Sequence, residues 1–198
     1  MAGLHAAAPL RVIRDPRPPP RLPNTVFGTL AFVVTELMFF AGMVSAFSIA
    51  RAGSVLGWPP PGQPRLPQME TAVNSFALLL SGLLLYIAGR RFARQRRSAR
   101  APLFFAIALG LFFVASQGVE WVALIREGLT LTSSQHGGFF YLIVGSHAVH
   151  AAAALCVLAM VALRLLRGRL QSSTFTAARI FWYFVVGIWP ALYLLVYL

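Results

Sequence analysis

The chain has 198 residues, of which 58% are hydrophobic and only 11% are charged, and its mean hydropathy is +0.72. A soluble domain of this length does not contain apolar runs as long as these, so the composition indicates an integral membrane protein. The formal net charge is +12 and every basic residue is an arginine, but the arginines lie between the apolar runs, which argues against nucleic-acid binding.

The first 24 residues form a tail rich in arginine and proline. Four arginines and five prolines lie between Arg11 and Pro23, and the segment lacks the apolar core of a signal peptide. We expect residues 1–24 to be a cytoplasmic tail that is disordered or docked on a partner. Residues 25–198 would then form the membrane domain.

Five apolar runs follow, each near the 20 residues that a membrane-spanning helix needs. They cover about residues 25–50, 69–90, 101–125, 138–163 and 178–198. The fold class predicted is therefore all-α, an integral membrane bundle of five transmembrane helices. Pro190 in the last run predicts a kink or a loosened turn. Trp58, Trp121 and Trp182 fall near predicted ends of the runs, as in an aromatic belt.

The placement of the arginines predicts the orientation. With the N-terminus inside, 14 of the 17 arginines lie on the inner side, in the tail and in the second and fourth connections. Because inner loops of membrane proteins carry the excess of arginine and lysine, we predict an N-in, C-out topology.

Glu36 lies near the middle of the first apolar run. An ionised acid at the centre of a membrane helix costs about 2.5–3.5 kcal/mol on insertion scales, so Glu36 should be protonated, paired or facing water. Three interpretations stay open. Glu36 could make a structural hydrogen bond as a protonated acid, form a carboxylate–imidazole pair with His147 or His150, or accept protons in transport.

His147 and His150 are spaced by three residues, so both rings can lie near one face of a helix. Such a pair could be half of a metal site, but the sequence offers few further ligands, and the single cysteine, Cys156, is two turns away. A buried acid or a lipid headgroup is therefore favoured over metal or haem. The sequence also contains no nucleophile with an orienting base, no phosphate loop and no cofactor fingerprint.

Several segments together resemble subunit III of the haem–copper terminal oxidases, the cytochrome c oxidase subunit III family, in its five-span form. The similar segments are Thr35–Gly42, the Trp58-Pro59-Pro60 loop, the start of the second run at Asn74, Gln117–Trp121 and Gly138–His150. The chain departs from the family pattern at Tyr183, Val186 and Val144, where the family usually has histidine, aspartate and threonine. These departures keep open a subunit-III-like protein associated with nitric oxide reductase.

The resemblance implies an accessory subunit without haem or copper, a non-catalytic member of a proton-translocating oxidoreductase. Its partners would be subunit I, which holds haem and copper, other oxidase subunits, phospholipids and a respiratory supercomplex, in the inner (cytoplasmic) membrane. Phospholipid would fill a V-shaped cleft between the first two helices and the other three, and Glu36 matches the family's carbodiimide-reactive glutamate. The residues expected at the cleft or buried near it are Glu36, Trp58, Asn74, Gln117, Glu120, Tyr141, His147 and His150.

Two functions of other classes remain as alternatives. The chain could be a stand-alone proton or solute transporter that uses Glu36, or a haem-binding anchor subunit that uses His147. Flux through the isolated chain would favour the first, and a haem spectrum that travels with the chain would favour the second.

Overall fold

The computed structural model describes residues 22–55 and 57–198, so most of the predicted tail lies outside the described residues. The elements are α1 (Asn24–Ala52), α2 (Gln68–Arg94), the short 3₁₀ helix η1 (Arg96–Ala99), α3 (Arg100–Arg126), α4 (Gln135–Leu166), α5 (Ser172–Leu192) and the π-helix η2 (Tyr193–Tyr197). Five of these segments are long and apolar enough to cross a membrane, and the described ranges contain no strand. The predicted all-α, five-helix class is confirmed.

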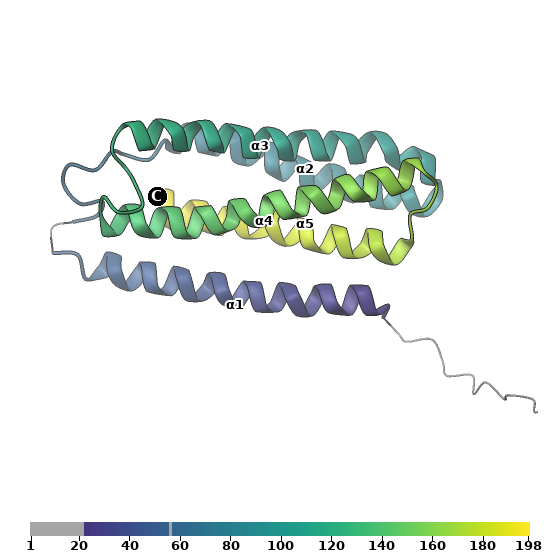
Figure 1. Cartoon of the computed structure of the whole chain (residues 1–198), viewed down its shortest axis with the longest axis horizontal. Coiled ribbons are helices and arrows are strands. Elements are labelled where there is room, and N and C mark those ends of the chain that lie inside the picture. Colours follow the sequence, from purple (N-terminus) through teal and green to yellow (C-terminus); the bar gives the residue numbers. More distant parts are fainter. Residues whose placement is uncertain (1–21, 56) are drawn as a thin grey trace, which may run out of the picture.

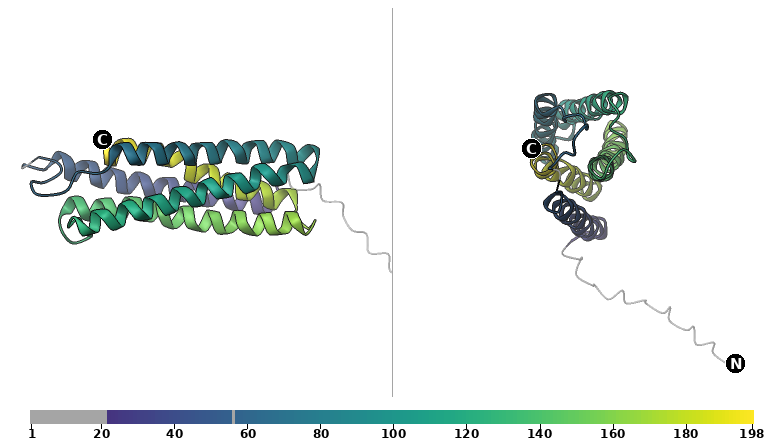
Figure 2. Two further views of the ribbon diagram at one scale, coloured as in Figure 1. Left: turned by 90° about the horizontal axis from the view of Figure 1, so that it is seen from above. Right: turned by 90° about the vertical axis from the view of Figure 1, so that its left-hand side faces the viewer.

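Helices α2, α3, α4 and α5 form a four-helix bundle, and α1 lies along its side (Figure 1; Figure 2, right). Helix α1 packs mainly on α5 and more sparsely on α4, whereas α2 packs on α3 and α5. The predicted grouping of the first two helices against the other three is therefore wrong, because α2 belongs to the bundle and only α1 stands beside it.

Small residues hold α2 inside the bundle. Gly82 of α2 faces the side chain of Val186 on α5, and a Cβ added at Gly82 would lie 3.0 Å from that valine. Ser81 donates a hydrogen bond of 2.7 Å to the carbonyl of Ala106 on α3. Close approach at small residues is the usual way in which membrane helices associate, and here it ties α2 to both neighbours.

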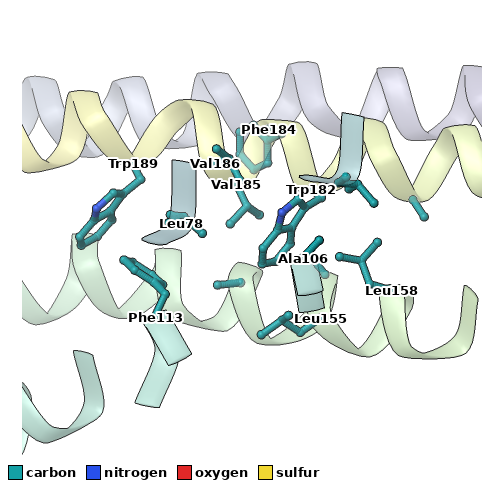
Figure 3. Close-up of a cluster of buried hydrophobic side chains, with 14 of the residues drawn as sticks. Leu78, Ala106, Phe113, Leu155, Leu158, Trp182, Phe184, Val185, Val186 and Trp189 are labelled. Carbon is teal, nitrogen blue, oxygen red and sulfur yellow. The ribbon is translucent and has the colours of Figure 1, made fainter. Parts of the chain in front are cut away.

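The core of the bundle is built around two tryptophans of α5 (Figure 3). Trp182 is 0% exposed, and its Nε1 donates to Ser81 Oγ at 3.1 Å. Trp189 is buried too and donates to Ser75 Oγ at 2.7 Å. The aromatic-belt expectation was wrong for Trp182, because this residue lies mid-helix and finds its hydrogen-bond acceptor within the protein.

The end of α5 widens beyond Pro190. Proline has no N–H group to bond the carbonyl of Val186, and three residues later the helix continues as the π turn η2. The wider turn is tied to the start of α2, since Gln68 Nε2 donates to the carbonyl of Tyr197 at 2.7 Å. The hydroxyl of Tyr193 donates back to the carbonyl of Gln68 at 3.0 Å.

Candidate functional site

Glu36 and His150 form a direct pair between α1 and α4. The distance from Glu36 Oε2 to His150 Nε2 is 2.9 Å, and the side chains of Glu36 and His150 are only 19% and 15% exposed. Glu36 lies about 18 Å from the start of the 29-residue α1, and His150 lies at the middle of the 32-residue α4. The pair thus joins the two helices near mid-membrane depth.

The hydrogen bonds of His150 fix how many protons the pair holds. Its Nδ1 lies 2.7 Å from the carbonyl oxygen of Ser146, and because a carbonyl only accepts, Nδ1 carries a hydrogen. The contact between Nε2 and Glu36 then contains one shared proton. If the acid holds no further proton, the pair is either imidazolium and carboxylate or imidazole and carboxylic acid, and in both states it has no net charge. A neutral pair avoids the large cost of a lone charge in the membrane.

Three phenylalanines enclose this pair. Phe40 of α1 and Phe184 of α5 meet the His150 ring edge to face, with centroids 5.4 Å and 6.0 Å away. Phe32 of α1 lies roughly parallel to the same ring at 6.5 Å. The polar pair is therefore surrounded by aromatic rings contributed by α1 and α5.

His147 lies in a different environment from His150. It is 1% exposed, stacks on Trp189 with ring centroids 4.8 Å apart, and is met edge to face by Phe113 at 6.2 Å. Neither ring nitrogen has a hydrogen-bond partner among the described residues. His147 of α4 lines a cavity of about 130 Å³ together with Gln117 of α3 and Trp189 of α5. The structure thus separates the two histidines that share the sequence motif.

A second polar cluster lies near the end of α3 and the start of α2. Glu120 Oε2 accepts from Gln117 Nε2 at 2.7 Å and lies 2.9 Å from Thr71 Oγ1. Gln117 Nε2 also reaches the hydroxyl of Tyr197 at 3.2 Å. These contacts join α2, α3 and η2, and they do not include Glu36. Two of the expected site residues, Gln117 and Glu120, therefore belong together but apart from the acid–histidine pair.

The three remaining expected residues make separate structural contacts. Asn74 Nδ2 donates to the carbonyl of Phe113 at 3.2 Å, and the Tyr141 hydroxyl donates to the carbonyl of Leu129 at 2.9 Å. Trp58 packs edge to face on His136, with ring centroids 5.2 Å apart. Asn74 joins α2 to α3, whereas Tyr141 and Trp58 join α4 to chain connections, and none of the three is hydrogen-bonded to Glu36.

An apolar groove runs between α1 and the bundle, at the end of the bundle where α1 begins. Its volume is about 460 Å³, and it ends at Phe32, the ring that lies beside His150. Its walls come from α1, α4 and α5, and they are formed by Asn24, Thr25, Gly28, Thr29, Phe32, Val157, Thr174, Ala177, Ala178 and Phe181. The groove therefore leads along α1 towards the Glu36–His150 pair.

The geometry gives the histidines no metal-binding arrangement. His150 is engaged by Glu36 and Ser146, and His147 is enclosed by aromatic rings. Within residues 22–55 and 57–198, no group of three histidine, cysteine, aspartate or glutamate side chains could hold a metal ion together.

Four polar residues that the sequence analysis did not select are important in the structure, namely Thr71, Ser75, Ser81 and Tyr197. A signal for the two serines was present. Trp182 and Trp189 are seven residues apart, which places them on one face of a helix, and a buried indole needs an acceptor. Serines on a neighbouring apolar run are suitable acceptors.

Comparison with known proteins gives one consistent result. The family model described as cytochrome c oxidase subunit III matches residues 24–198. A probable cytochrome c oxidase subunit 3 of Nocardia farcinica is 32% identical over 182 residues, 88% of each chain. The cytochrome c oxidase subunit 3 of Corynebacterium diphtheriae is 31% identical, covering 96% of this chain and 94% of that one. The corresponding Synechocystis protein is 32% identical over 87% of this chain and 75% of its own.

Proposed function

The chain belongs to the cytochrome c oxidase subunit III family, and from this we propose that it serves its terminal oxidase as an accessory subunit that carries phospholipid beside α1. As a subunit III it is part of a multi-subunit oxidase complex. In this proposal haem and copper belong to partner subunits, and the chain binds the catalytic subunit I and supports its activity.

The groove beside α1 is the observation that carries the lipid proposal. It is apolar, about 460 Å³ in volume, and open along the edge of the bundle between α1 and α5. Most of α1 is exposed, with only Val26, Phe40, Met43 and Phe47 buried. An acyl chain lying in this groove would cover apolar surface that the isolated chain leaves open, and within a membrane such an association rests on close van der Waals packing.

In this arrangement the Glu36–His150 pair would have a structural role. It connects α1 to α4 at one end of the groove without adding net charge to the membrane. Because α1 makes few other contacts with α4, the pair would fix the width of the groove. Proton translocation itself would belong to the catalytic subunit.

The contact with subunit I would use the apolar exterior of the bundle. Large apolar side chains are exposed on several helices, including Met38 at 71%, Phe76 at 68% and Val119 at 71%. A second membrane subunit can cover such faces by close packing. The excess of arginine in the connections predicts that the N-terminal side faces the cytoplasm, with the complex in the cytoplasmic membrane.

Purification of the oxidase from its native membrane tests this proposal. We expect a subunit gel to show this chain beside the haem–copper subunit, and we expect phospholipid to copurify. Gly28 lines the groove and has no neighbour within 4 Å of an added Cβ, so Gly28→Phe should fill the groove and release lipid. Gly42→Phe, on the same helix but outside the groove, is the control. Absence of the chain from the oxidase would reject the proposal, and unchanged lipid content in Gly28→Phe would reject its lipid site.

A further inference from the structure

A pocket lined by four arginines lies where the connection between α4 and α5 meets the start of α3. Its volume is about 330 Å³. The four are Arg96 and Arg97 of η1, Arg100 at the start of α3, and Arg167 directly after α4. This pocket lies on the α3 side of the bundle, and it shares no residue with the groove beside α1.

No carboxylate compensates these charges within the described part of the chain. The ion pair found there joins His150 to Glu36, and no arginine takes part in one. Glu120 lies at the far end of α3, 20 residues and about 30 Å from Arg100. Glu70 is in the first turn of α2, which is also at the far end of the bundle.

The local structure of the pocket bears most directly on two of the four arginines, Arg96 and Arg100. Arg96 Nη1 donates to the carbonyl of Leu170 at 2.9 Å, so it ties η1 to the α4–α5 connection. The Nε of Arg100 is buried and has no hydrogen-bond partner among the described residues. A buried donor without an acceptor is unfavourable, so an acceptor supplied by a bound anion would relieve it.

We propose that this pocket binds a phosphate group. The planar guanidinium group matches phosphate oxygens through two parallel hydrogen bonds, and four positive groups around one pocket favour an anion with several oxygens. The remaining walls are apolar and include Leu165, Leu166 and Leu170. That mixture suits the phosphate and glycerol of an anionic phospholipid, and a soluble phosphate presents the same oxygens.

The test uses the oxidase complex that contains this chain, with the double variant Arg97→Gln/Arg167→Gln. Both residues are exposed and line the pocket, so their loss should leave assembly intact. Arg169→Gln is the control, because Arg169 belongs to the same connection but does not line the pocket. A subunit gel of each variant verifies assembly.

Two arms distinguish the sources of phosphate. In the first, complexes in phosphatidylcholine nanodiscs are titrated with phosphatidylglycerol, and the bound lipid is counted by mass spectrometry. In the second, binding of radiolabelled inorganic phosphate is measured by equilibrium dialysis in detergent. Each arginine near an anionic membrane surface adds about 1 kcal/mol of attraction, so the double variant should weaken binding in the lipid arm about 30-fold.

Each outcome decides the proposal. Weakened binding in the lipid arm or in the phosphate arm, with Arg169→Gln unchanged, supports the site and identifies its source. Equal binding by wild type and the double variant in both arms overturns it, as does an equal loss in Arg169→Gln, which would indicate only diffuse charge. The proposed lipid groove beside α1 is tested by other residues and would stand in either case.

Discussion

A contact of 2.9 Å between His150 Nε2 and Glu36 Oε2 connects α4 to α1. The Nδ1 hydrogen of His150 is committed to the carbonyl of Ser146, so the contact with the acid contains one shared proton. The pair is therefore a neutral unit, and the chemistry at Glu36 can be changed in ways that either keep or remove its hydrogen bond.

We expect Glu36→Gln to leave assembly largely intact and Glu36→Ala to weaken it. The amide of glutamine can donate to the bare Nε2 of neutral His150, whereas alanine leaves that nitrogen without a partner. Interhelical hydrogen bonds in membranes are worth about 0.6–2 kcal/mol, so α1 should loosen by that amount in the alanine variant. Retention of the chain in the purified oxidase after detergent washing measures this. Equal losses in both variants would show that the ionised pair is required.

His147 should behave as a packed ring whose nitrogens are dispensable. Because neither nitrogen has a partner among the described residues, His147→Phe removes two buried polar groups and keeps the stack on Trp189. Replacing an unsatisfied polar group by an apolar group of similar shape is neutral or stabilising. His147→Ala should instead destabilise by about 2–5 kcal/mol through the cavity it leaves. Thermal unfolding in detergent compares the two, and a large loss in His147→Phe would reveal an acceptor that the histidine needs.

The sequence predicted that His147 or His150 pairs with Glu36, but it could not decide which of the two does so. Three residues turn a helix by about 300°, so the side chains of His147 and His150 point about 60° apart. That difference is enough to direct one ring to α1 and the other to Trp189 of α5. Which ring meets Glu36 depends on the rotation of α4 within the bundle, and local spacing carries no information about that rotation.

Ser81 joins three helices, and its loss should be costly. Its hydroxyl donates to the carbonyl of Ala106 on α3 and accepts from Nε1 of Trp182 on α5. Ser81→Ala leaves the buried indole N–H without an acceptor, for which we expect about 1–3 kcal/mol of lost stability. Ser48→Ala is the matched control, since that hydroxyl bonds only the carbonyl of Val44 in its own helix. Denaturant titration in mixed micelles measures both, and equal small losses would show that water reaches Trp182.

The number of the helices and the bounds of the first three could be predicted, because each apolar run contains within itself the residues that a membrane-spanning helix needs. Helix α5 begins at Ser172, six residues before the predicted start. The packing partners of each helix could not be predicted. A helix that is apolar nearly all round does not show which face it buries, so the sequence offered no check on the grouping of α2 with α1 that the resemblance implied, and α2 packs on α3 and α5. The determining contacts are small residues such as Gly82, whose meaning depends on the partner Val186.

Gly110 of α3 should not tolerate a side chain. A Cβ there would lie 2.7 Å from the Trp182 ring and 2.8 Å from Leu155 Cδ2, closer than packed atoms approach. Gly110→Ala is therefore expected to destabilise by about 1–3 kcal/mol through overpacking. Gly118→Ala on the same helix is the control, because an added Cβ there has no neighbour within 4 Å. Melting temperatures in detergent should fall for the first variant only; a shared fall would point to a general effect of substitution in α3.

Val186 lies where the resemblance noted in the sequence predicts an aspartate, and from its surroundings we expect that an acid is not tolerated here. The valine is 8% exposed and packs against Gly82 of α2 near the middle of α5. Val186→Asp would put a carboxylate at mid-membrane depth, at a cost of about 2.5–3.5 kcal/mol on insertion scales. We expect this variant to be lost from the purified oxidase, whereas Val186→Thr should be retained, because its hydroxyl can bond the carbonyl one turn earlier in α5. Normal retention of Val186→Asp would mean that a hydrogen-bond donor, from water or from a partner subunit, reaches this position in the assembled complex.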